Sequence, residues 1–207
     1  MIEGTSPGTG TRNRVAAVVP AAGQSTRFGT MKLLADVGGA PLLERTLASL
    51  LDAGVARVVV VTRPGNAFDA VPAMADPRVT AVANPDPARG MFSSIQAGLA
   101  AAAGDVVLVL PADMPFVAPE TVAAVIARGV ATESVVVPVH QARRGHPIAI
   151  PGRLRDALLG LAPETTLKDA LAASGASMVL LDVADAGVLR DVDVPGDLVR
   201  QARRLED

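Results

Sequence analysis

The residues best suited to chemistry lie in short segments that follow runs of β-branched residues. The first segment is a loop of small and polar residues, 20–29, with Lys32 shortly after it. Small residues allow the backbone to approach a ligand, and successive N–H groups can form a concavity that binds an anion. Arg27 and Lys32 would add the positive charge that a triphosphate requires. The loop predicts phosphate binding, but an ordinary strand-to-helix turn explains its composition equally well.

A single aspartate, Asp113, follows the fourth apolar run and lies between Pro111 and Pro115. A carboxylate at the end of a buried strand is well placed to hold a divalent cation against phosphates. Capping of the next helix explains Asp113 less well, because the helix is predicted to begin only at residue 119. We therefore interpret Asp113 as a metal ligand.

Two further aspartates, Asp191 and Asp193, lie near the C-terminus and precede Pro195. We expect that they do not hold one metal ion together, and that one of them joins Asp113 in binding it while the other faces elsewhere. The alternative is that both only precede a helix, with its N-cap at residue 193 or 194.

Two other polar segments could contact a substrate. Ser93 and Ser94 open a predicted helix, whose free N–H groups and hydroxyls could meet a phosphate, a sugar or a base, although helix capping explains one serine. His146 precedes Pro147 in a loop and could contact substrate, although a lone histidine is more often simply solvated. No Ser/His/Asp or zinc-ligand spacing is evident.

The composition excludes several classes of protein. The 207 residues include no Cys, Trp or Tyr, so disulfides and thiolate chemistry are excluded. The net charge of −2 provides no field that would attract nucleic acid or an anionic membrane. We expect a cytoplasmic protein with a disordered lead-in at residues 1–13 and one domain at residues 14–207.

The hydrophobic pattern predicts alternating strands and helices. Continuous apolar strands at 58–61 and 106–110 are typical of parallel strands covered on both faces, and β-α-β alternation predicts a three-layer α/β/α domain with a mostly parallel sheet. Ligands bind such sheets beyond the carboxyl ends of the strands. The predicted strands are 15–19, 57–62, 79–82, 106–110, 134–139, 148–150 and 178–183, and the predicted helices are 41–53, 91–103, 119–127, 154–159, 166–173 and 195–205.

These segments, in this order, resemble the MobA-like nucleotidyltransferases, which have a glycosyltransferase-A-like (Rossmann-like) fold. The sequence is most similar to the molybdenum cofactor cytidylyltransferases within that family. Each motif is modest alone, but five in register are specific, and they span residues 15–198. The matching segments are 21–29 with Lys32, 90–94, 111–116, 145–147 and 191–198.

The resemblance implies roles for individual residues. Asp113 and Asp193 would bind Mg²⁺, Lys32 would contact phosphate, and Lys32, Arg27 and Asp113 would be catalytic. It also implies that His146 and Met114 lie on the acceptor side. The nucleotide-binding residues implied are Ala21, Ala22, Gly23, Gln24, Ser25, Arg27, Lys32, Ser93, Ser94, Pro111 and Ala112.

The resemblance leaves the two substrates open. Residues 21–23 favour CTP, as in the cytidylyl enzymes, whereas Met114 is typical of the guanylyl enzymes that use GTP. Residues 162–169 depart from the family's usual pattern, which leaves molybdopterin, a sugar phosphate or phospholactate as the acceptor. A molybdoenzyme could be a partner. An accessory member without transfer activity and a cofactor-delivering chaperone are the alternative functions.

The hypothesis for the reaction is direct in-line displacement. A terminal phosphate of the acceptor would attack the α-phosphorus of the triphosphate, and pyrophosphate would leave. Because the attacking oxygen is already anionic, no general base is required, and catalysis would rest on alignment and charge neutralisation.

Overall fold

The computed structural model describes residues 15–23, 32–65 and 68–193. The lead-in expected at residues 1–13 and the helix expected at 195–205 lie outside these residues. The strands are β1 (Val15–Pro20), β2 (Arg57–Thr62), β3 (Val79–Ala83), β4 (Val106–Val109), β5 (Val135–His140), β6 (Arg143–Arg144), β7 (Ile148–Pro151) and β8 (Met178–Asp182). The α-helices are α1 (Leu42–Asp52), α2 (Met91–Ala101), α3 (Pro119–Thr132), α4 (Arg155–Leu159) and α5 (Leu167–Ala173). Five short 3₁₀ helices are η2 (Lys32–Leu34), η3 (Pro72–Ala75), η4 (Pro87–Arg89), η5 (Gly152–Leu154) and η6 (Ala186–Leu189).

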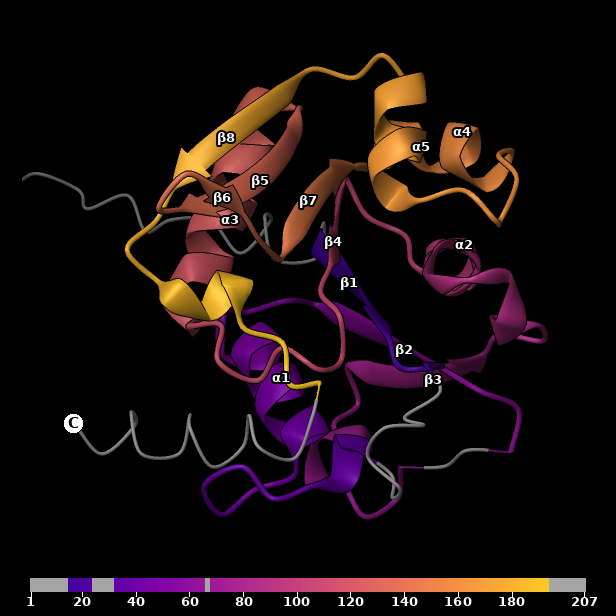
Figure 1. Cartoon of the computed structure of the whole chain (residues 1–207), viewed down its shortest axis with the longest axis vertical. Helices are drawn as coiled ribbons and strands as arrows, with labels where there is room; N and C mark the ends of the chain where they lie inside the picture. The colour runs from indigo at the N-terminus through magenta and orange to yellow at the C-terminus, as the bar shows by residue number, and fades with distance from the viewer. Residues whose placement is uncertain (1–14, 24–31, 66–67, 194–207) are drawn as a thin grey trace, which may run out of the picture.

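The strands form one sheet in the order β3-β2-β1-β4-β7-β5-β6, with β8 paired to β5 (Figure 1). Strands β3, β2, β1 and β4 are parallel, and β7 is antiparallel to both β4 and β5. The chain moves from β1 outward to β3 and then returns to place β4 on the other side of β1. The point where the order reverses, between β1 and β4, is where sheets of this kind bind ligands.

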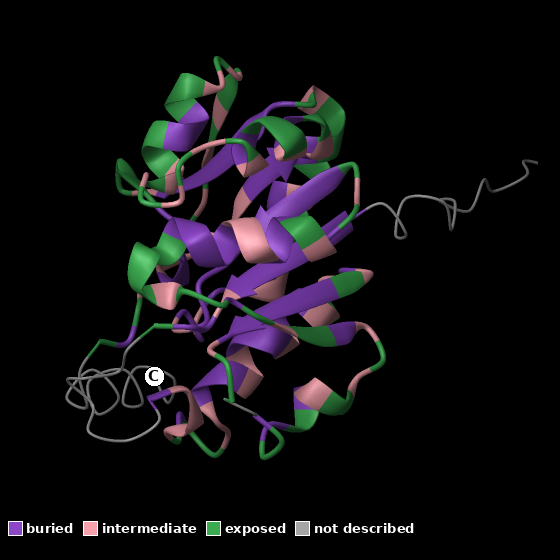
Figure 2. Ribbon diagram, turned by 90° about the vertical axis from the view of Figure 1, so that its right-hand side faces the viewer, coloured by how far each residue is buried: buried purple, intermediate pink, exposed green. Residues whose placement is uncertain are grey.

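Alternating side chains of the strands face two separate hydrophobic cores. One core packs Val58 and Leu108 against α1 and α3, and the other packs Val59 and Val107 against α2, α4 and α5. Buried residues accordingly run along the strands and the inner faces of the helices (Figure 2). The predicted three-layer arrangement and the two-sided burial of β2 and β4 are therefore confirmed.

The element boundaries differ from the prediction mainly at α3. The helix was expected to end at residue 127, but it continues to Thr132, because Gly129 packs closely against the sheet near Ala149 and Val106. Pro41 is the N-cap of α1 rather than a first-turn residue. The short strand β6 was not predicted, because a two-residue strand in a hairpin has no detectable period.

Helix α2 packs unusually close to the sheet at Gly98. A Cβ at this position would overlap Val18 and lie 3.0 Å from Val61. We expect Gly98→Ala to destabilise the fold by about 1–2 kcal/mol net, because overpacking outweighs the better helix propensity of alanine. Thermal unfolding should show a midpoint several degrees lower. Gly160→Ala is the control, since its Cβ would meet nothing nearer than 3.6 Å, and equal effects of both changes would contradict the argument.

Within the described ranges, no helix is both long and apolar enough to cross a membrane.

Candidate active site

The carboxyl ends of β1 and β4 are joined by backbone hydrogen bonds. The N–H of Leu110 donates to the carbonyl of Val18 at 3.1 Å, and the N–H of Ala112 donates to the carbonyl of Pro20 at 3.2 Å. This pairing sets the start of the glycine-containing loop beside the turn that carries Asp113. The arrangement follows from the parallel register of the two strands, which ends both at the same edge of the sheet.

The Asp113 turn is held on both sides. The Thr46 hydroxyl, fully buried on α1, donates to the carbonyl of Ala112 at 3.0 Å. The N–H of Val192 donates to the carbonyl of Asp113 itself at 3.0 Å. The second bond places Asp193 next to Asp113. The pattern of the sequence could not predict this contact, because the two aspartates lie far apart in the chain.

Lys32 lies between the two carboxylates. Its Nζ is 2.9 Å from Oδ2 of Asp113 and 3.1 Å from Oδ1 of Asp193. The Lys32 side chain is 10% exposed, whereas those of Asp113 and Asp193 are 29% and 58% exposed. The three side chains that the sequence placed in separate motifs thus meet at the switch point of the sheet.

The charge of this cluster favours cations. Burial by itself lowers the pKa of Lys32, but the hydrogen bonds and negative charges of Asp113 and Asp193 outweigh burial and raise that pKa above its usual value. Lys32 therefore stays an ammonium at neutral pH. With two carboxylates around it, the cluster keeps a net negative charge.

Asp191 was expected to face away from the cluster, but the charges of the cluster still act on its carboxyl. It and Asp193 flank Val192, which is fully buried, and residues two apart in an extended segment share a face. Burial raises the pKa of Asp191, and the negative charges of Asp193 and Asp113 raise it further. Its carboxyl thus lies within electrostatic range of the site.

The donor set suits a divalent cation that is also held by a nucleotide. Asp113 and Asp193 already place one oxygen each around a single positively charged nitrogen. The part of the chain that the structure describes holds no group of three or more His, Cys, Asp or Glu side chains able to bind a metal. Mg²⁺ is typically bound in this way, by one or two carboxylates together with substrate phosphates and water.

His146 lies within electrostatic range of Asp113. Its backbone N–H donates to the carbonyl of Val188 at 2.9 Å, and its peptide bond to Pro147 is cis. Gly145 must lack a side chain, because a Cβ would overlap the carbonyl of Val188. Burial lowers the pKa of His146 to about 4, although the charge of Asp113 opposes the shift. The imidazole is therefore neutral at physiological pH.

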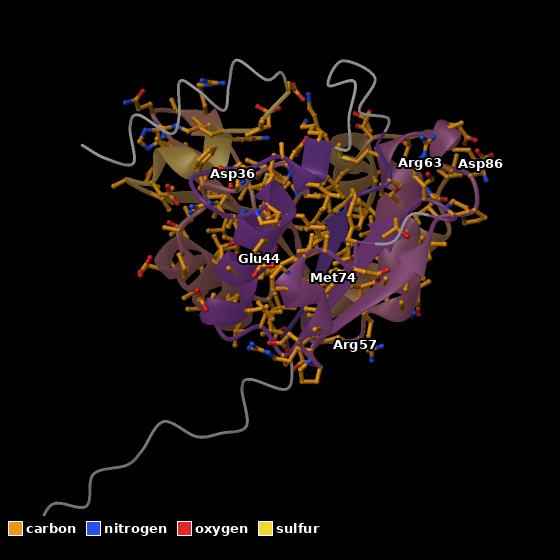
Figure 3. All side chains as sticks on the ribbon, turned by 90° about the horizontal axis from the view of Figure 1, so that it is seen from below. Asp36, Glu44, Arg57, Arg63, Met74 and Asp86 are labelled. Carbon is orange, nitrogen blue, oxygen red and sulfur yellow. The ribbon has the colours of Figure 1, made fainter. Side chains whose placement is uncertain are left out.

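The two serines form a buried polar network rather than an open surface. Asn84, the first residue after β3, donates through Nδ2 to Oγ of Ser93 at 2.8 Å and to Oγ of Ser94 at 3.0 Å. The hydroxyl of Ser93 donates in turn to the carbonyl of Gly90 at 2.7 Å. The N–H of Asp86, which Figure 3 labels at the periphery of the molecule, donates to Oδ1 of Asn84. Contact of the serines with nucleotide stays a prediction.

The other predicted residues are placed as follows. Ala21, Ala22, Pro111 and Ala112 are buried at the ends of β1 and β4, and Gly23 is exposed with open space around it. Met114 packs in the core that α1 and α3 cover, so its contact with an acceptor stays a prediction. Gln24, Ser25 and Arg27 lie outside the described residues.

Sequence reasoning missed Thr46 and Asn84. Asn84 could have been found, since it is the first polar residue beyond a strand that ends at the ligand edge. Thr46 carries no such signal, because its position in α1 fits an ordinary helix. Figure 3 labels another residue of this helix, Glu44, which accepts from the N–H of Ala73 at 2.7 Å and ties α1 to η3.

Replacement of Thr46 by valine tests the anchor of the Asp113 turn. The change leaves the carbonyl of Ala112 without this donor in a buried site, at a cost of about 1–3 kcal/mol of unfolding free energy. Because the turn loosens, we expect kcat for pyrophosphate release to fall more than the KM for nucleotide rises. Thr46→Ser keeps the hydroxyl and should retain near-wild-type kcat, KM and unfolding free energy. If serine reduced them as much as valine does, the role of Thr46 would depend on the shape of its side chain and not on the hydrogen bond.

The low pKa of His146 predicts a pH-dependent stability. The unfolded histidine takes up a proton near pH 6.5, but the folded one does so only near pH 4, so stability is lost as the pH falls from about 6.5 towards 4. The loss between pH 7.5 and pH 5 should be about 2 kcal/mol, measured by urea unfolding. His146→Gln should remove this part of the slope. His140→Gln, which alters the other of the two histidines, should retain it.

Comparison with known proteins identifies the family to which the chain is similar. Residues 17–178 match the model of the MobA-like NTP transferase domain. The chain is 34% identical over 193 residues to a 2-C-methyl-D-erythritol 4-phosphate cytidylyltransferase from Frankia casuarinae, covering 88% of this chain and 71% of that protein. It is 22% identical over 194 residues to the molybdenum cofactor cytidylyltransferase of Escherichia coli, covering 93% and 98% of the two chains.

Among solved structures, the Rv0371c protein from Mycobacterium tuberculosis H37Rv aligns with a TM-score of 0.77 and 25% identity, over 93% of this chain and all of that one. This likeness extends over nearly the whole fold of the chain. The chain belongs to the MobA-like NTP transferase family, and it is a nucleotidyltransferase.

Proposed function

We propose that the protein is a divalent-metal-dependent cytidylyltransferase, which transfers CMP from CTP to a phosphate group of an acceptor and releases pyrophosphate. The observation that carries the proposal is the cluster of Lys32, Asp113 and Asp193 at the carboxyl edge between β1 and β4. CTP is supported by the similarity of the chain to cytidylyltransferases, including those of Frankia casuarinae and Escherichia coli. Mg²⁺ is the metal we propose, and the M. tuberculosis protein has also been solved in complex with manganese.

The residues would act by position and charge. The loop that begins at Ala21 and Ala22 receives the triphosphate through its backbone N–H groups, and Lys32 places an ammonium at the phosphates. Asp113 and Asp193 would hold the metal ion, which supplies charge neutralisation at the phosphate oxygens. An oxygen of the acceptor phosphate forms a bond to the α-phosphorus as the bond from that phosphorus to the β-phosphate bridging oxygen breaks. Lys32 then stabilises the negative charge that develops on the leaving pyrophosphate.

His146 and the hairpin that leads to it are proposed to face the acceptor. A neutral imidazole next to Asp113 can donate or accept one hydrogen bond without adding charge to the site. Residues 162–169, where the chain departs from the family's pattern, are tied to the end of η4 by an ion pair, in which Nε of Arg89 lies 2.8 Å from Oε1 of Glu164. This segment would contribute to the choice of acceptor.

Two acceptors are proposed. Molybdopterin is proposed first, because the five motifs together resemble the molybdenum cofactor enzymes. 2-C-methyl-D-erythritol 4-phosphate is the second, because the Frankia casuarinae protein is named for it and is the more similar in sequence. Both carry a phosphate monoester, so both fit the same displacement.

The test is pyrophosphate release by the purified protein with Mg²⁺ and each of four nucleoside triphosphates, with and without each acceptor. We expect release that requires CTP and one of the two acceptors. Release with GTP in place of CTP would overturn the assignment of the base. No release under any combination, from protein shown to be folded, would overturn the proposed function.

A further inference from the structure

Lys32 occupies the position of a cation between the two proposed metal ligands. Its Nζ contacts Asp113 and Asp193 at 2.9 and 3.1 Å. Both distances lie within the usual range for N–H···O hydrogen bonds, and each bond joins opposite charges. A lysine in this position keeps the two carboxylates together in the absence of any other cation.

A divalent ion that bound both carboxylates would have to replace this ammonium. Lys32 Nζ already lies between one oxygen of each carboxylate, and two positive centres held so close together would repel each other. The ammonium cannot simply lose its partners either, because the Lys32 side chain is 10% exposed, and a poorly solvated charge without a partner is strongly unfavourable.

A triphosphate removes this obstacle, because its oxygens offer Lys32 new acceptors at the same edge of the sheet. We propose that Lys32 acts as an internal counter-ion that makes the metal ion and the nucleotide bind cooperatively. The ammonium lies on Asp113 and Asp193 before the nucleotide arrives, and transfers to its phosphates as the metal ion takes over the carboxylates. The inference rests on the proposed function for the identity of the metal ligands.

The coupling has a measurable consequence in the absence of nucleotide. Displacing the Lys32 ammonium makes metal binding less favourable in the wild-type protein. This unfavourable free energy is absent when residue 32 carries no charge. We therefore expect Lys32→Met to bind Mn²⁺ at least tenfold more tightly than the wild-type protein in isothermal titration calorimetry without nucleotide. Lys168→Met is a matched control, because it makes the same change at the other lysine of the chain, which is exposed on α5, and it should bind Mn²⁺ as the wild type does.

A second titration measures the cooperativity itself. The probe is a CTP analogue with a methylene bridge between the α- and β-phosphorus atoms, which cannot release pyrophosphate. Mn²⁺ should raise the affinity of the wild-type protein for this analogue by a larger factor than it does for Lys32→Met, because in the variant no ammonium has to move. Lys32→Gln provides a second uncharged variant with the same expectation, and circular dichroism shows which of the two is folded.

The outcomes separate the two proposals. If folded Lys32→Met and Lys32→Gln bind Mn²⁺ no more tightly than the wild type, while the wild type binds it with the analogue present, the counter-ion role is wrong and the metal assignment stands. If the wild type binds no Mn²⁺ even with the analogue, the metal assignment fails and the counter-ion role fails with it. Tighter binding by both variants, with Lys168→Met unchanged, supports the inference.

Discussion

Asp113→Asn should reduce kcat for CTP-dependent pyrophosphate release by about 10³-fold or more. The substitution removes the charge from a carboxylate that both contacts Lys32 and is proposed to bind the metal. A loss of about 4 kcal/mol of transition-state stabilisation corresponds to this factor, and it is in the range expected when metal-assisted charge neutralisation is lost. Because asparagine has nearly the same shape and the backbone of the turn is anchored by Thr46 and Val192, the thermal midpoint should change little.

The control for this change is Asp156→Asn. Asp156 lies on α4 with its side chain 91% exposed, and its Oδ1 forms an ion pair with Nη1 of the neighbouring Arg155 at 3.2 Å. Its replacement should leave kcat within about twofold, as expected for a surface carboxylate away from the site. Near-wild-type turnover by folded Asp113→Asn would contradict the metal assignment.

Lys32→Met is expected to produce the second large effect, a loss of about 10²–10³-fold in kcat/KM for CTP. The charge of Lys32 is proposed to stabilise the departing pyrophosphate, and loss of one such donor typically costs this much. The same variant should bind Mn²⁺ more tightly without nucleotide, as inferred above. Opposite changes in catalysis and in metal affinity are a signature that a merely damaged fold would not produce.

The measurement is steady-state pyrophosphate release over a range of CTP concentrations, with Arg57→Met treated in parallel. The control should keep its kcat/KM, because Arg57 is exposed at the first residue of β2, at the opposite end of the strand from the site. An unchanged kcat/KM for Lys32→Met would remove Lys32 from the catalytic machinery, even if Asp113 proves essential.

The site also explains why the chain needs precise anchors away from the ligands. Asp113 and Asp193 lie 80 residues apart in sequence, yet one backbone hydrogen bond from Val192 sets their separation. Thr46 fixes the other side of the Asp113 turn from the neighbouring helix. Changes at these anchors should therefore affect turnover without touching any charge of the site.

Much of the fold could be predicted because the signals for it are local. The apolar runs at β2 and β4 are short, β-branched and continuous, and only strands buried on both faces tolerate such a pattern. The ends of the apolar runs also predicted that residues 21–23 and Asp113 lie at one edge of the sheet. Residues that directly follow parallel buried strands meet at that edge. Helix α3 ran past its predicted end because tertiary packing of Gly129 against the sheet outweighed the low helix propensity of glycine.

The sequence by itself determined the two-residue and helical periods, the order of the elements and the chemical types of Lys32, Asp113 and Asp193. Only the tertiary structure decided that the three side chains meet, that Lys32 bridges the carboxylates, and that Asp191 lies within reach of them. It also decided that Ser93 and Ser94 are bonded to Asn84 inside the molecule. The physical reason is that periodicity reports on which face a residue occupies in its own element, whereas hydrogen bonds and charge pairs depend on distances between elements that are far apart in the chain.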